Sequence, residues 1–219
     1  MGLTEKRTVC IVGGYFEDIV LYISRVLKLM DLKTVIADYS HNHRMYTSIP
    51  KIKGIEPLGK VIDYSGVGYI FGTGGIGNGI EDVDGADMII RLYDISGFIP
   101  DETPCIIISD ESKRNLDLIE TMKLKDHSMV IIRDYTGAIK ARLEKMADIL
   151  GCGSLTVIPV NCEYKKCEVL AEHNDRFRFN GISSDLKNVL FGIIEFVCPD
   201  IQKKRIKKAY HMAEKGVYG

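Results

Sequence analysis

The chain has 219 residues, of which 46% are hydrophobic and 27% are charged, and its formal net charge is −1. This length can bury one sizeable core, so we expect a single domain over residues 1–219. The near-neutral charge gives no indication of nucleic-acid binding through bulk basic charge, and no apolar run is long enough to span a bilayer. The first residues, MGLTEKRTVC, contain no signal-peptide core, so we expect a cytoplasmic protein.

The first elements form a strand, a helix and a second strand. Residues 7–12 are a β-branched run that ends at Gly13-Gly14, and residues 17–30 carry apolar side chains at helical spacing. Residues 33–37 are a second apolar run, which ends at Asp38. A strand, helix and strand with short turns predict a βαβ unit with parallel strands and a right-handed crossover.

The middle of the chain, residues 41–87, is irregular and rich in glycine, with few helical signals. Two short strands are expected there, over residues 60–64 and 67–71, joined by Ser65-Gly66. A further strand over residues 88–93 ends at Asp94-Ile95-Ser96-Gly97.

The second half continues the alternation of apolar runs and amphipathic segments. Strands are expected over residues 105–108, 129–132 and 156–160, and helices over 111–123, 138–150, 184–197 and 201–215. The whole pattern predicts a three-layer α/β domain, in which a mostly parallel sheet of about six to eight strands has helices on both faces.

The turn between the first strand and the first helix is the leading candidate for a binding site. Ligands of open parallel sheets bind beyond the carboxyl ends of the strands, where helix N-termini favour anions. Here the turn reads Gly13-Gly14-Tyr15-Phe16-Glu17-Asp18, so it has two glycines and two carboxylates but no lysine. The acids suit a helix N-terminus and repel a triphosphate, so a structural role is favoured over anion binding.

A second glycine-rich segment follows the strand over residues 67–71. It matches both glycines of GxxxxGK[ST], but Asn78 replaces the lysine and Gly79 replaces the hydroxyl residue. It also contains GxGxxG, but too few residues precede the next strand to form a crossover helix. We therefore interpret the segment as a turn at the sheet edge or near a ligand cleft, and a phosphate-binding role is the less favoured alternative; its candidate residues are Gly72, Gly74, Gly75, Gly77, Asn78 and Gly79.

The six cysteines are scattered and include no CxxC pair, which favours buried free thiols in a reducing compartment. Cys162 and Cys167 are the closest pair and lack a second zinc half-site, and His41 and His43 are expected to be solvated. The sequence therefore leaves the metal content unknown.

The order of elements resembles the ParA/MinD family of dimeric P-loop ATPases, and especially its CpaE/TadZ branch, which is associated with polar pilus and secretion assembly. The similarity covers roughly residues 7–197. It is carried by VCIVGGYFEDIV (9–20), KTVIADYS (33–40), GYIFGTGG (68–75), MIIRLYDISG (88–97), IIISDES (106–112) and LTVIPVN (155–161).

The resemblance implies a P-loop NTPase-like topology, with a nucleotide site at Gly13 to Asp18, Asp38, Asp94 and Gly97. It also implies that Asp38 lies near the nucleotide and that Asp94 orients Mg²⁺ or water; in an alternative register, Gly72 takes the place of Asp94. The family's loop resembles KGGxGKT, and this chain lacks both lysines and the Mg²⁺-binding hydroxyl residue. Without lysine the phosphates lose much of their electrostatic stabilisation, so ATP and Mg²⁺ are disfavoured as cofactors.

Three functions follow. The first is a pseudo-ATPase scaffold that forms homodimers and positions a pilus or secretion machine through protein contacts. The second is an active ATPase that uses Arg91, Arg133 or a lysine of a partner chain. The third is a Rossmann-like dinucleotide-binding protein with Asp38 on the ribose.

The end of the chain, residues 200–219, is a basic helix with a thin apolar face. Packing of this helix on the domain is favoured over the membrane anchor found in MinD-type proteins.

Overall fold

A computed structural model describes residues 6–14, 16–41, 43–49, 60–72, 83, 85–96, 103–122, 124, 128–150, 154–161, 179 and 182–216. Its centre is an eight-stranded sheet in the order β3-β4-β2-β5-β1-β6-β7-β8. The strands are β1 (Arg7–Gly13), β2 (Thr34–Asp38), β3 (Ile62–Tyr64), β4 (Val67–Phe71), β5 (Met88–Tyr93), β6 (Cys105–Asp110), β7 (Ser128–Tyr135) and β8 (Ser154–Pro159).

Seven of these strands run in one direction, and only β3 pairs antiparallel, with β4. The first strand therefore lies inside the sheet, between β5 and β6. The carboxyl ends of the parallel strands meet at one edge, which we call the carboxyl edge. This edge is where ligands bind in open parallel sheets.

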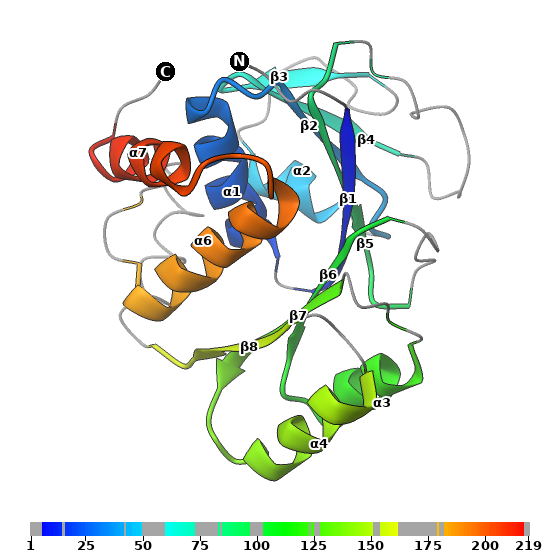
Figure 1. Cartoon of the computed structure of the whole chain (residues 1–219). Coiled ribbons are helices and arrows are strands. Elements are labelled where there is room, and N and C mark those ends of the chain that lie inside the picture. The colour runs from blue at the N-terminus through cyan, green and yellow to red at the C-terminus, as the bar shows by residue number, and fades with distance from the viewer. Residues whose placement is uncertain are drawn as a thin grey trace.

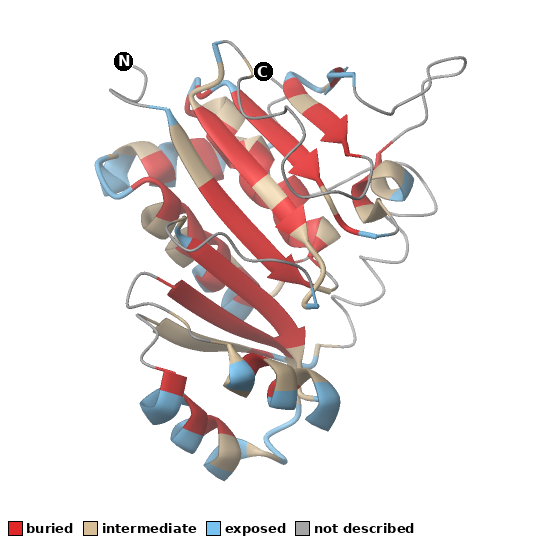
Figure 2. Cartoon of the chain, turned by 90° about the vertical axis from the view of Figure 1, so that its right-hand side faces the viewer, coloured by how far each residue is buried: buried red, intermediate tan, exposed pale blue. Residues whose placement is uncertain are grey.

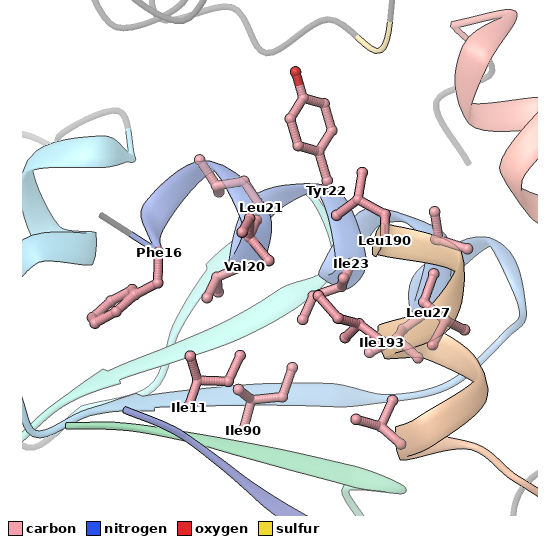
Figure 3. Packing of buried hydrophobic residues seen from close by; sticks show 14 of the residues in the cluster. Ile11, Phe16, Val20, Leu21, Tyr22, Ile23, Leu27, Ile90, Leu190 and Ile193 are labelled. Carbon is pink, nitrogen blue, oxygen red and sulfur yellow. The ribbon is translucent and has the colours of Figure 1, made fainter. Parts of the chain in front are cut away.

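One face of the sheet is covered by α1 (Glu17–Leu29), α6 (Ser184–Val197) and α7 (Lys203–Glu214). Ile11 and Ile90 rise from the sheet toward α1, while Leu190 and Ile193 of α6 face α1 from the side (Figure 3). These side chains belong to the larger apolar core, and their burial holds α1 on the sheet.

The other face carries α3 (Lys113–Thr121) and α4 (Lys140–Leu150), which lie over the half of the sheet that contains β6, β7 and β8 (Figure 1). Leu116 and Ile119 of α3 and Met146 of α4 pack on alternate residues of the strands, such as Val12 and Ile107. Figure 2 shows the buried strands between helices whose outer sides are exposed. The predicted three-layer α/β fold is therefore confirmed.

Residues 41–87 have few helical signals, and the short helix α2 (Arg44–Ser48), which follows β2, was not among the elements expected from the sequence. Its sequence has no apolar period, and its start is held by Asp38, which accepts a hydrogen bond from the backbone N–H of Met45 at 3.0 Å. No helix among the described residues is long and apolar enough to cross a membrane.

Candidate functional site at the carboxyl edge

The turn from β1 to α1 is tight and packed. Only Gly14, Tyr15 and Phe16 separate the strand from the helix, whereas GxxxxGK[ST] places four residues between its glycines. Gly13 has a φ of +137°, and a Cβ there would lie 1.8 Å from the carbonyl oxygen of Ile108. Glycine is thus required at Gly13 by the close approach of β6 to the turn. Tyr15 lies outside the described residues.

The first helical turn holds a buried ion pair that connects it to β7, two strands from β1 in the sheet. Arg133, near the end of β7, donates from Nη1 to Oδ1 of Asp18 at 2.6 Å and from Nη2 to Oδ2 at 2.9 Å. The side chains are 3% and 5% exposed, respectively. Arg133 is one of the cations proposed above for the active-ATPase alternative. Its guanidinium is instead directed at Asp18 in a bidentate pair, and both side chains are withdrawn from solvent.

A second arginine reaches the turn from α2. The guanidinium of Arg44 passes close to Gly14, since a Cβ added there would lie 3.4 Å from Nη1. Arg44 Nη1 lies 3.7 Å from Oε1 of Glu17, and Nε lies 4.0 Å from Oδ1 of Asp94. The Arg44 side chain is 31% exposed, so water screens these longer pairs more than the buried one.

Sequence analysis missed Arg44. The available signal was its place just after β2, in the polar stretch His41-Asn42-His43-Arg44 at the carboxyl edge. The two histidines in this stretch drew attention only as a possible pair of metal ligands.

Asp38 lies at the predicted place and is closed to ligands. It is 1% exposed, and its Oδ1 accepts from the backbone N–H of Ser40 at 2.9 Å and from Oγ of Ser40 at 2.5 Å. Oδ2 accepts from the backbone N–H of Met45. Burial raises the pKa of Asp38, opposed by these hydrogen bonds. The carboxylate therefore organises the turn between β2 and α2.

Asp94 lies just after β5 and also stabilises the β2–α2 turn through a hydrogen bond. Its Oδ2 accepts a hydrogen bond from the backbone N–H of His41 at 2.6 Å. Among the described residues, no three His, Cys, Asp or Glu side chains gather closely enough to hold a metal ion. A metal at Asp94 would therefore need further oxygen ligands from a bound molecule or water. Gly97, Cys162 and Cys167 lie outside the described residues.

The second glycine-rich segment begins at a packed position. Gly72 follows β4, and its backbone N–H donates to the carbonyl of Asp38 at 3.0 Å. A Cβ at Gly72 would lie 2.8 Å from the ring of Tyr39, which stacks on Tyr93 with centroids 5.3 Å apart. The first glycine thus makes room for an aromatic side chain. Gly74, Gly75, Gly77, Asn78 and Gly79 lie outside the described residues.

Arg91 does not reach the β1–α1 turn. It lies opposite Cys10 in the β1–β5 register, and Cys10 belongs to the core under α3 and α4. Arg91 is therefore on the opposite face from α1.

The carboxyl edge around β1 is acidic. Four carboxylates outnumber the two nearby guanidiniums; they belong to Glu17, Asp18, Asp38 and Asp94. Burial raises the pKa of Glu17; Arg44 opposes this shift, and Asp18 adds to it. A polyanion entering this edge would meet carboxylates and arginines that already have acidic neighbours. The structure therefore brings together the predicted residues of the first turn, Asp38 and Asp94, but in an arrangement that opposes phosphate.

The chain matches no protein-family model, and no curated protein is significantly similar to it in sequence.

Proposed function

We propose that this chain is a ParA/MinD-like scaffold of the CpaE/TadZ type, which does not hydrolyse ATP. In this proposal it forms homodimers and positions a pilus or secretion machine through protein contacts. Support comes from the parallel sheet with β1 inside it, and from the acids at the end of β2 and just after β5.

The observation that carries the proposal is the engagement of the two arginines at the β1–α1 turn. Arg133 is paired through both nitrogens with buried Asp18, and Arg44 lies between Glu17 and Asp94. Phosphoryl transfer depends on cations that neutralise charge developing on the phosphates. To supply one here, the chain would have to break an existing ion pair and leave a carboxylate behind.

An active ATPase is the second candidate, and the position of Arg44 beside Gly14 favours it. The nitrogen–oxygen distances from Arg44 to Glu17 and Asp94 are 3.7 and 4.0 Å, and the Arg44 side chain is partly exposed. A rotation of this side chain toward a bound phosphate would cost less than breaking the Asp18–Arg133 pair. In this hypothesis Arg44 replaces the missing lysine.

The dinucleotide-binding alternative receives less support. It requires the acid after the second strand to accept hydrogen bonds from a ribose. Asp38 is buried, and both of its oxygens already accept hydrogen bonds from the protein.

The test is calorimetric titration with ATP, ADP and NAD, each with and without Mg²⁺, together with an assay of ATP turnover. Matched variants are Arg44→Gln and Arg142→Gln, because Arg142 is a half-buried, ion-paired arginine far from the turn, between α3 and α4. We expect no turnover and no binding at about millimolar nucleotide. Mg²⁺-dependent ATP binding that Arg44→Gln abolishes and Arg142→Gln preserves would establish the ATPase alternative.

The partner part of the proposal needs a cellular test. Removing the chain should abolish assembly of the pilus or secretion machine, whereas a chain carrying Arg44→Gln should restore it. Failure of this variant at normal protein levels would count against a scaffold that works without nucleotide.

A further inference from the structure

The outward side of α7 carries a row of basic side chains that no part of the proposed function uses. Lys204, Lys207, Lys208 and Lys215, here called the lysine row, are all exposed, and His211 lies among them. Positions 204, 208, 211 and 215 follow the three- and four-residue spacing that places side chains on one helical face. From Lys204 to Lys215 the row extends about 16 Å along the helix axis.

The opposite side of α7 is already occupied. Ile206, Ala209, Tyr210 and Ala213 are buried in the core, where α7 packs on α1 (Figure 1). Arg205, the only arginine of the helix, donates a hydrogen bond to the carbonyl of Met30 at the end of α1. The predicted packing of the basic helix on the domain is therefore confirmed, and the lysine row faces away from the contact.

The lysine row has no carboxylate partners in the part of the chain that the structure describes. The ion pairs of α7 join Lys203 to Glu195, Glu214 to Lys187, and Glu214 to His211. Residues 203–215 hold six Lys or Arg and one Glu, a formal charge of +5, so the remainder of the chain carries −6. This segment thus has a strong net positive charge, while the remainder of the chain is net negative.

This charge arrangement works against the stability of the helix. The first turn contains Lys203, Lys204 and Arg205 and no acid, so three cations lie at the positive end of the helix dipole. Like charges also recur at three- and four-residue spacing, as for Lys204 with Lys207 and Lys208. Sequences that break such local rules without a structural gain do so mainly at functional positions.

We infer that the lysine row is a docking surface for an acidic segment of a partner protein. A bilayer would require apolar side chains to insert, and those of α7 are buried against the domain. Base readout in the grooves relies largely on planar bidentate contacts, above all from arginine, and single strands are bound on stacked aromatic rings; the row contains no arginine and no aromatic side chain. A short acidic segment also contacts only the lysine row, whereas an extended polyanion would be repelled by the negative remainder of the molecule.

The probe for this inference is a fluorescein-labelled peptide of about 16 residues, with glutamates at the spacing of the row. Its binding to the full chain is measured by fluorescence anisotropy at two salt concentrations. The variant Lys204→Gln with Lys208→Gln is compared with Lys113→Gln and Lys145→Gln, two exposed lysines on α3 and α4, so the net charge changes equally. Circular dichroism melts confirm that all variants fold.

We expect the α7 variant to bind the peptide about tenfold more weakly, and the control variant to bind like the parent. Binding should also weaken severalfold between about 50 and 200 mM salt. Equal loss in both variants, or no binding at low salt, would overturn the inference. So would tighter binding of vesicles with about one-third phosphatidylserine or of a duplex of about 20 base pairs, or row-dependent self-association of the chain.

The experiment is independent of the proposed function, because no residue of the carboxyl edge takes part. A failure of the nucleotide or assembly tests leaves the peptide result intact, and the reverse also holds.

Discussion

The buried Asp18–Arg133 pair should be the most sensitive electrostatic contact in this protein. Its two nitrogen–oxygen distances are 2.6 and 2.9 Å, and both side chains are almost fully buried. Replacing Arg133 with Met leaves the Asp18 carboxylate buried without its bidentate partner, which costs about 3–5 kcal/mol in comparable sites. A chain of this size loses about 2–4 °C of Tm per kcal/mol, so Arg133→Met should melt about 6–20 °C lower.

The assay is a double-mutant cycle in urea with Asp18→Leu, Arg133→Met and both changes together. Since the double variant removes both charges, its loss should be smaller than the sum of the single losses by at least about 2 kcal/mol. Arg142→Met is the matched control, because Arg142 pairs with Asp117 and Glu120 at 2.6 and 3.0 Å but is 30% exposed. We expect it to cost less than about 1 kcal/mol. If Arg133→Met is as mild as Arg142→Met, the burial argument is refuted.

Three further predictions concern other positions. Gly13→Ala should lower the free energy of unfolding, measured in urea, by at least about 3 kcal/mol, because the added Cβ would clash with a backbone carbonyl. Gly192→Ala, on α6, should raise the free energy of unfolding by about 0.5–1 kcal/mol, because its Cβ would lie in open space. Because burial raises the pKa of Glu17, stability should fall as pH rises from 4.5 through the raised pKa, and Glu17→Gln should flatten this fall; an unchanged pH curve would contradict it. Burial raises the thiol pKa to about 11 for Cys10 and about 12 for Cys105, so iodoacetamide at pH 8 should label both only after denaturation, as peptide mapping would show.

The strands of this fold could be predicted because buried parallel strands are nearly continuous apolar runs. Residues 105–108 and 129–132 are such runs, and both lie within β6 and β7. The prediction stopped β7 too early because Arg133 has the sequence signature of a strand end. In the structure Arg133 continues the strand, because its buried charge is neutralised by Asp18, 115 residues away in the sequence.

The site was predictable only in part. The rule that ligands bind at strand carboxyl ends correctly located Gly13, Asp38 and Asp94 at one edge. It could not show that Asp38 is closed by Ser40 and Met45, because those bonds depend on a turn with no periodic signal. The position of Arg44 depends on the same turn, and was missed for the same reason.

The interior position of β1 has a consequence for synthesis of the chain. Its neighbours β5 and β6 end at Tyr93 and Asp110, so β1, once synthesised, waits for roughly 75–100 further residues. At typical translation rates this interval lasts about 4–20 s. During that time the apolar segment from Val9 to Val12 has neither of its hydrogen-bonding partners, and its exposed edges invite aggregation. A nascent chain that ends before β6 should therefore depend on chaperones, and the N-terminal half should not be obtained as a folded fragment.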